Sequence, residues 1–161
     1  MTASTDAATA PDPLRTRHAV VVDDDESLLR VVTAGLEHAG CIVTAFNRFG
    51  IFKSDEPTRR AEAIVKATTR FDDAKKFLSS AAPDILITDV RLGGSNGLHL
   101  VVMSKLKHPE MSAVVMTGYD DVVLKKDAEA AGARYVVKPF MISDLLELLG
   151  LPHPLVERGD G

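Results

Sequence analysis

The chain has 161 residues, of which 45% are hydrophobic and 26% are charged, as is typical of a globular domain with one hydrophobic core. Its formal net charge is -4 and no basic stripe is present, which argues against nucleic acid as the main partner. The single cysteine, Cys41, excludes an internal disulfide and a multi-cysteine metal cluster, and it fits a cytoplasmic protein. No apolar run reaches membrane-spanning length.

Both ends of the chain predict little regular structure. Residues 1–17 are rich in Ala, Thr, Asp and Pro and contain no apolar segment of the kind that a signal peptide needs. We therefore expect a disordered N-terminal lead-in over residues 1–17 and a flexible C-terminal tail over residues 152–161. Residues 18–151 are expected to form one domain.

Within this domain, short apolar runs typical of buried strands alternate with segments of helical periodicity. Strands are expected over residues 19–22, 85–88, 113–117 and 135–137. One helix is expected from Ser27 to a stop at Gly40, and another from about Asp121 to Gly132. Two further helices are expected, one over the segment that carries Leu98, Val101, Val102 and Leu106, and one around residues 145–149. Strands separated by helices predict right-handed crossovers and a doubly wound α/β fold with a parallel sheet.

The second strand is ambiguous in the sequence. Residues 41–53 (CIVTAFNRFGIFK) and 63–75 (AIVKATTRFDDAK) share six of thirteen residues at an offset of 22. Either 41–46 or 63–68 can be the second strand, with residues 71–78 as the helix that follows. The rest of the region, roughly within 47–68, is expected to be an insertion.

Polar side chains follow four of the expected strands, at the point where each strand ends. These residues are Asp23-Asp24-Asp25, Asp89, Thr117 and Lys138. Each alone has an ordinary explanation, such as carboxylates at a helix N-terminus, a loop acid, a strand-end hydroxyl or a lysine at a turn. In a parallel sheet, however, the carboxyl ends of the strands share one edge, where ligands bind. Their conjunction therefore indicates a functional site.

The chemistry of this set is specific. Neighbouring carboxylates raise one another's pKa unless a cation compensates, and Mg²⁺ is the ion expected for an oxygen site with few protein ligands. A carboxylate beside such an ion can attack phosphorus and form an aspartyl-phosphate. Lys138, Thr117 and the backbone amides around residues 92–94 could stabilise the developing charge. The sequence thus predicts a phosphoryl-acceptor site.

Four segments in this order, VVVDDDES, PDILITDVRLGGSNGL, VVMTGYDD and AGARYVVKPF, resemble the response-regulator receiver domains of two-component signalling. The resemblance covers residues 19–149 except for the insertion. It implies a flavodoxin-like (βα)5 fold, with a five-stranded parallel sheet in the order 2-1-3-4-5. It also implies that Asp89 is the phosphorylated residue, and that Mg²⁺ is bound by Asp24, Asp23, Asp89 and the Arg91 backbone carbonyl. Asp25 is a possible further ligand.

The resemblance implies further roles around Asp89. Lys138 and Thr117 would contact the phosphoryl group, Tyr135 would be the aromatic switch partner of Thr117, and the Lys138–Pro139 bond would be cis. Arg91 and Tyr119 occupy the two variable positions that flank the site, and both are bulky. We expect them to obstruct hydrolytic water and to slow dephosphorylation.

One position near the site departs from the family pattern. The loop after Asp89 has Gly93 where relatives usually have proline. This change loosens the loop entropically, but it removes no catalytic group.

The resemblance also implies partners. The phosphoryl donor would be a sensor histidine kinase or a histidine phosphotransfer protein, and the output would go to a downstream protein target, without direct contact to nucleic acid or membrane. Few residues follow the last expected helix, so we expect a stand-alone receiver. We expect no enzyme activity beyond its own phosphorylation and dephosphorylation.

Two other functions fit parts of the pattern. A pseudo-receiver would keep the fold as a binding module without phosphorylation, but the complete set of acids, threonine and lysine argues against it. A haloacid-dehalogenase-like phosphatase could use Asp23, Asp25, Thr117 and Lys138. That reading leaves Asp89 without a role and offers only Asp144 and Glu147 as metal-binding acids after the lysine.

Overall fold

The computed structural model describes residues 15–47, 50–52, 71–92 and 95–152. The predicted lead-in and tail therefore lie largely outside the described residues. The strands are β1 His18–Val22, β2 Ile42–Asn47, β3 Gly50–Phe52, β4 Ile85–Asp89, β5 Arg91–Leu92, β6 Ser95–Asn96, β7 Ser112–Thr117 and β8 Arg134–Val137. The helices are α1 Glu26–His38, α2 Phe71–Ser80, α3 Gly97–Lys107, α4 Val122–Ala130 and α5 Ile142–Leu148.

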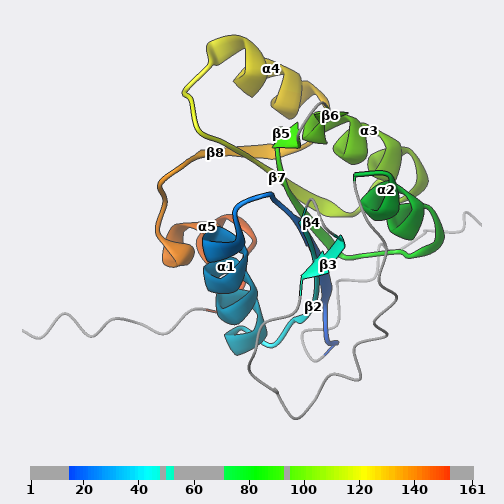
Figure 1. Cartoon of the computed structure of the whole chain (residues 1–161), viewed down its shortest axis with the longest axis vertical. Helices are drawn as coiled ribbons and strands as arrows, with labels where there is room; N and C mark the ends of the chain where they lie inside the picture. The colour runs from blue at the N-terminus through cyan, green and yellow to red at the C-terminus, as the bar shows by residue number, and fades with distance from the viewer. Residues whose placement is uncertain (1–14, 48–49, 53–70, 93–94, 153–161) are drawn as a thin grey trace, which may run out of the picture.

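The main sheet has the strand order β3-β2-β1-β4-β7-β8 (Figure 1). Five of these strands are parallel, and their order, β2-β1-β4-β7-β8, confirms the predicted 2-1-3-4-5 topology. The sixth strand was not predicted: β3 pairs antiparallel with β2 and extends the edge of the sheet. The short strands β5 and β6 form a separate two-stranded antiparallel sheet.

The structure assigns the second strand to the first of the two similar segments. Ile42 pairs with His18 and Phe46 pairs with Val22, so β2 lies parallel to β1. Phe46 is buried and packs against Phe77 of α2, with ring centroids 5.4 Å apart. The alternative segment, residues 63–68, lies outside the described residues.

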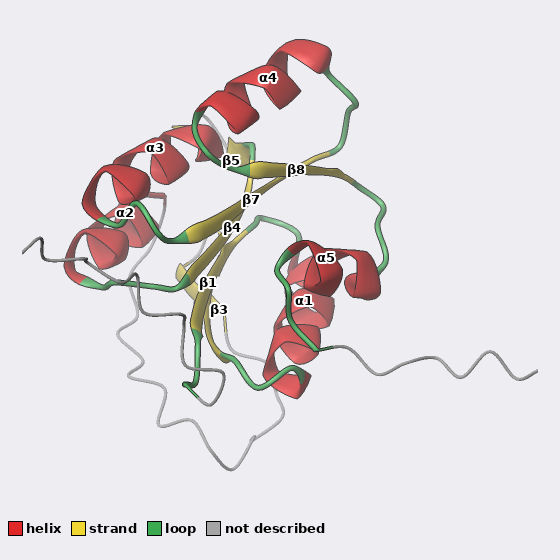
Figure 2. Cartoon of the chain, turned by 180° about the vertical axis from the view of Figure 1, so that it is seen from behind, coloured by secondary structure: helices red, strands yellow, loops and turns green. Residues whose placement is uncertain are grey.

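Successive residues of β1 supply both faces of the sheet, as the pleat requires. Ala19 and Val21 pack with α1 and α5, whereas Val20 and Val22 pack on the opposite face with residues of α2, α3 and α4. Figure 2 shows α1 and α5 on one side of the sheet and α2 and α3 on the other. Each fully buried Val or Leu contributes about 2 kcal/mol. In and just after the last helix, Leu145, Leu146 and Leu149 are buried, whereas Leu148 is half-buried. No helix among the described residues is long and apolar enough to cross a bilayer.

Helix boundaries follow local capping chemistry. Asp25 caps the N-terminus of α1, and Asp121 caps α4. Gly40 and Gly132 follow these helices with φ of 91° and 79°, a left-handed conformation that glycine adopts without strain. These positions agree with the predicted helix ends, and each helix leads the chain back from the carboxyl edge of the sheet.

Candidate functional site

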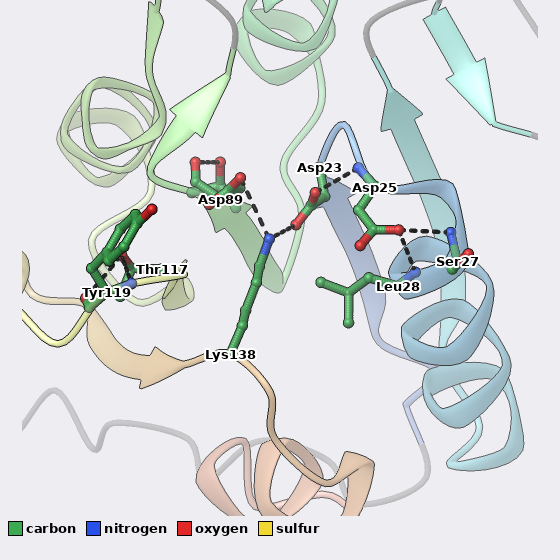
Figure 3. A network of polar contacts seen from close by, with 9 residues as sticks. Asp23, Asp25, Ser27, Leu28, Asp89, Thr117, Tyr119 and Lys138 are labelled. Carbon is green, nitrogen blue, oxygen red and sulfur yellow. Dashed lines mark hydrogen bonds and ion pairs between the residues drawn. The ribbon is translucent and has the colours of Figure 1, made fainter.

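The four predicted strand-end positions converge at the carboxyl edge of the sheet. Asp23 directly follows β1, Asp89 ends β4, Thr117 ends β7 and Lys138 directly follows β8. Figure 3 shows Lys138 extending between the carboxylates of Asp23 and Asp89. β1, β4 and β7 are buried almost throughout, so Asp23, Asp89 and Thr117 are presented from a rigid base, whereas β8, which leads to Lys138, is only partly buried.

The Lys138 ammonium links the two carboxylates. Its Nζ lies 2.6 Å from Asp23 Oδ2 and 3.4 Å from Asp89 Oδ2. The side chain of Asp23 is only 1% exposed, whereas those of Asp89 and Lys138 are 15% and 22% exposed. A charge as buried as that of Asp23 is stable only when it is paired and hydrogen-bonded. The structure therefore brings together three of the predicted site residues.

The surroundings of Asp89 disfavour the charged form of its carboxyl group. Burial raises the pKa of the Asp89 carboxyl, and the neighbouring Asp23 carboxylate raises it further. The Lys138 ammonium and a hydrogen bond from the Arg91 backbone N–H lower the pKa, but they do not cancel the rise. A further cation beside Asp89 would therefore stabilise its charged form.

The three consecutive acids have different surroundings. Asp23 Oδ1 accepts a hydrogen bond from the Asp25 backbone N–H at 2.8 Å. The Asp25 side chain is exposed and accepts from the backbone N–H groups of Ser27 and Leu28 at 3.0 and 3.2 Å. The ordinary helix-terminal explanation therefore describes Asp25, whereas Asp23 belongs to the site. Asp24 lies between them and is half-buried.

The site offers carboxylate oxygens as ligands for the expected Mg²⁺. Among the described residues, no group of three or more His, Cys, Asp or Glu side chains is arranged to hold a metal ion. Asp23 and Asp89 nevertheless converge on one cation, the Lys138 ammonium, and both offer oxygen ligands. A hard ion that keeps several waters needs only one or two protein carboxylates. The residues present therefore fit Mg²⁺, and Asp23 and Asp89 could each supply it with a carboxylate oxygen.

The β5–β6 hairpin positions the Arg91 backbone. Arg91 pairs with Asn96 and Leu92 pairs with Ser95. The Arg91 N–H donates to the Asp89 carboxylate. Gly93, where the sequence departs from its relatives, lies outside the described residues together with Gly94.

Two residues next to Asp89 were missed by the sequence reasoning. The buried Thr88 hydroxyl donates to the Asp89 backbone carbonyl at 3.0 Å. Gly97 begins α3 so close to this carbonyl that a Cβ would overlap the oxygen and lie 2.6 Å from Thr88 Oγ1. A glycine just before a helical segment was the available signal for Gly97, whereas nothing in the sequence distinguished Thr88.

The expected switch pair, Thr117 and Tyr135, meets at the backbone of a third residue. Thr117 Oγ1 donates to the Tyr119 carbonyl at 3.1 Å and accepts from the Tyr119 N–H at 3.2 Å. The Tyr135 hydroxyl donates to the same carbonyl at 2.9 Å and accepts from the Asp121 N–H at 3.0 Å. The two hydroxyls are thus coupled through Tyr119.

The two flanking positions are also in contact with each other. The Arg91 guanidinium carbon lies 5.4 Å from the centroid of the Tyr119 ring, within the range of a cation–π interaction. The Tyr119 residue is 69% exposed. The Lys138–Pro139 bond is cis, as the resemblance implied.

Comparison with known proteins identifies this arrangement. The sequence model of the response regulator receiver domain matches residues 56–150, more than half of the chain. The chain therefore belongs to the response regulator receiver family. This match begins after β1, α1, β2 and β3, and the structure shows how these elements join the same sheet and its helical layer.

Individual relatives extend the match and include longer proteins. The DNA-binding transcriptional regulator NtrC of Escherichia coli (strain K12) is 31% identical over 130 residues, which cover 80% of this chain and 23% of NtrC. The transcriptional regulatory protein FixJ of Bradyrhizobium diazoefficiens is 30% identical over 128 residues, 76% of this chain and 50% of FixJ. This chain thus spans at most half the length of either relative.

Solved structures agree with the fold. The BeF3-activated receiver domain of DrrB, a Thermotoga maritima protein, superposes with a TM-score of 0.63 at 25% identity. The superposition covers 84% of this chain and 96% of that domain.

Proposed function

We propose that this receiver accepts a phosphoryl group on Asp89 from a phosphohistidine donor, in a Mg²⁺-dependent transfer that switches a protein-interaction face. The observation that carries the proposal is the convergence of Asp23 and Asp89 on the Lys138 ammonium at the carboxyl edge of the sheet. In the transfer, a phosphorus–oxygen bond forms at Asp89 as the phosphorus–nitrogen bond of the donor breaks. The donor imidazole is the leaving group.

The residues of the site divide this work. The Asp89 carboxylate is held at the end of a rigid strand, and its Oδ atoms are the nucleophile. Asp23, Asp24, Asp89 and the Arg91 carbonyl would hold Mg²⁺, which when bound supplies positive charge beside the transferred group. Lys138 lies close enough to Asp89 to contact a phosphoryl oxygen, and Asp23 keeps its ammonium in place.

We propose that Thr117 and Tyr135 transmit the phosphorylation of Asp89 to the surface of the domain. An aspartyl-phosphate would compete with the Tyr119 backbone for the Thr117 hydroxyl, because among the described residues that hydroxyl bonds only to Tyr119. Since Tyr135 bonds the same carbonyl, moving the loop at Tyr119 would release or reorient the Tyr135 ring.

The face formed by α4, β8 and α5 is suited to read this change. α4 buries only Ala128, whereas Val122 and Val123 at its start are 67% and 68% exposed. Met141, at the start of α5, is 68% exposed. A downstream protein could cover these apolar side chains.

The partners follow from the family. We propose a sensor histidine kinase or a histidine phosphotransfer protein as donor, since NtrC and FixJ are regulators with homologous receivers. NtrC as a whole is a DNA-binding regulator, and this chain matches 23% of its length. We propose that the receiver itself acts in the cytoplasm through protein contacts, and that it acts on no substrate other than its own phosphoryl group.

The central test is incubation with acetyl phosphate and Mg²⁺ followed by intact-mass measurement. We expect a phosphoryl adduct on the wild type and on the control Asp120→Asn, which changes an exposed carboxylate beyond β7. Asp89→Asn should carry none. An adduct on Asp89→Asn would refute the site, and no adduct on any variant would favour a pseudo-receiver.

The phosphatase alternative is disfavoured by the geometry. It requires Asp23 and Asp25 to act together, yet the Asp25 carboxylate is exposed and caps α1. Multiple turnovers of a phosphomonoester would reinstate it.

A further inference from the structure

A groove between α3 and α4 lies outside the site described above. Its volume is about 440 Å³. α3 lines it with Val102, Lys105 and Leu106, and the opposite wall carries Asp127, Ala130 and Ala131. The small alanines leave the groove open, so it is a hollow with mainly apolar walls.

The same surface also carries a projecting apolar side chain. Leu106 is 80% exposed, the most exposed large hydrophobic residue among those described, and Val102 is 41% exposed. Both belong to α3, whereas the alanines belong to the α4 side. The patch therefore contains a ridge and a hollow side by side.

The two charges of the groove lie on opposite walls. Lys105 and Asp127 form no ion pair with each other or with any other described residue. The Lys105 ammonium donates to the Pro109 backbone carbonyl at 3.3 Å. Asp127 is exposed. Each charge is thus available to an opposite charge brought from outside.

We propose that this groove binds a second copy of the chain about a two-fold axis. A two-fold interface uses the same patch on both subunits, so the patch must complement itself. Here the Leu106 ridge of one copy enters the hollow beside Ala130 and Ala131 of the other. Lys105 of each copy then meets Asp127 of the other, which gives two equivalent ion pairs. The groove thus presents on one patch both charges and both the apolar ridge and the hollow that a two-fold contact needs.

Sedimentation velocity of the full chain over about a hundredfold concentration range tests the proposal. We expect a monomer–dimer equilibrium that Leu106→Glu shifts strongly to monomer. The matched control is Val31→Glu, which places the same charge at a 56% exposed position on α1 and should leave the dimer unchanged. Circular dichroism verifies that each variant is folded.

Charge reversal tests the pairing itself. Lys105→Glu and Asp127→Lys should each weaken the dimer by about tenfold or more, because each brings like charges together. The double variant should recover most of the wild-type affinity. A chain that is monomeric at every concentration overturns the proposal and leaves the groove to a different partner. A dimer insensitive to Leu106→Glu, or a double variant as weak as the single ones, overturns it equally.

Discussion

Gly97 and Asp89 approach each other so closely that no side chain fits between them: a Cβ on Gly97 would occupy the position of the Asp89 carbonyl oxygen. The Gly97 N–H also donates to the Val90 carbonyl at 2.8 Å. The start of α3 is thereby fastened to the backbone that carries the phosphoacceptor. This contact holds the Asp89 backbone in place against the start of α3.

Gly97→Ala should therefore disrupt both stability and phosphorylation. We expect a loss of about 3 kcal/mol in the free energy of unfolding, because the displaced atoms are backbone. Phosphoryl incorporation should fall with it. The control Gly118→Ala adds a methyl group with no atom within 4 Å and should change stability by less than about 0.5 kcal/mol. Equal losses for both variants would contradict the close contact.

Asp89→Asn should stabilise the protein near neutral pH. The Asp89 pKa is raised in the folded protein, chiefly by burial and then by Asp23. The folded state therefore binds more protons than the unfolded state, and stability falls as the pH rises from about 4 through the raised pKa. Asparagine removes this penalty, so we expect a gain of about 1 kcal/mol at neutral pH.

Measurements of Asp89→Asn at low pH supply the control for this prediction. Thermal unfolding without added metal should show the gain of Asp89→Asn disappearing below about pH 4, where the carboxyl is protonated in both states. A gain independent of pH would mean that charge is not the cause.

Lys138→Met should destabilise the protein and make it more responsive to Mg²⁺. Removing the ammonium leaves the buried Asp23 carboxylate without its ion-pair partner, which costs about 3 kcal/mol. Added Mg²⁺ should then raise the melting temperature of the variant more than that of the wild type. Lys76→Met, on the exposed side of α2, is the control. Equal Mg²⁺ responses would show that the ion and the ammonium do not share carboxylates.

Tyr119 should determine how long the phosphoryl group lasts. Its ring packs on Arg91, and we expect the pair to hinder access of water to Asp89. Tyr119→Ala should speed dephosphorylation severalfold, whereas Tyr119→Phe keeps the ring and the cation–π contact and should remain close to wild type. The measurement is the decay of the phosphoryl adduct by intact mass after the donor is removed. An unchanged rate in Tyr119→Ala would contradict the shielding role.

The sequence predicted those features that depend on neighbouring residues along the chain. Buried strands such as residues 85–88 are short apolar runs, and helix ends such as Gly132 are marked by local backbone requirements. Because parallel strands end at a common edge, the order of these elements was enough to predict that Asp23, Asp89 and Lys138 meet.

Only the tertiary structure decides between segments that compete for one place in the sheet, or brings together residues that lie far apart in the sequence. The two similar segments share six of thirteen residues, and only pairing with β1 selects residues 42–47 as β2. Three adjacent acids look alike in sequence, but packing buries Asp23 while the start of α1 takes Asp25 as its cap. Hydrogen bonds of Thr117 and Tyr135 to Tyr119 depend on loop geometry, which side-chain periodicity does not encode.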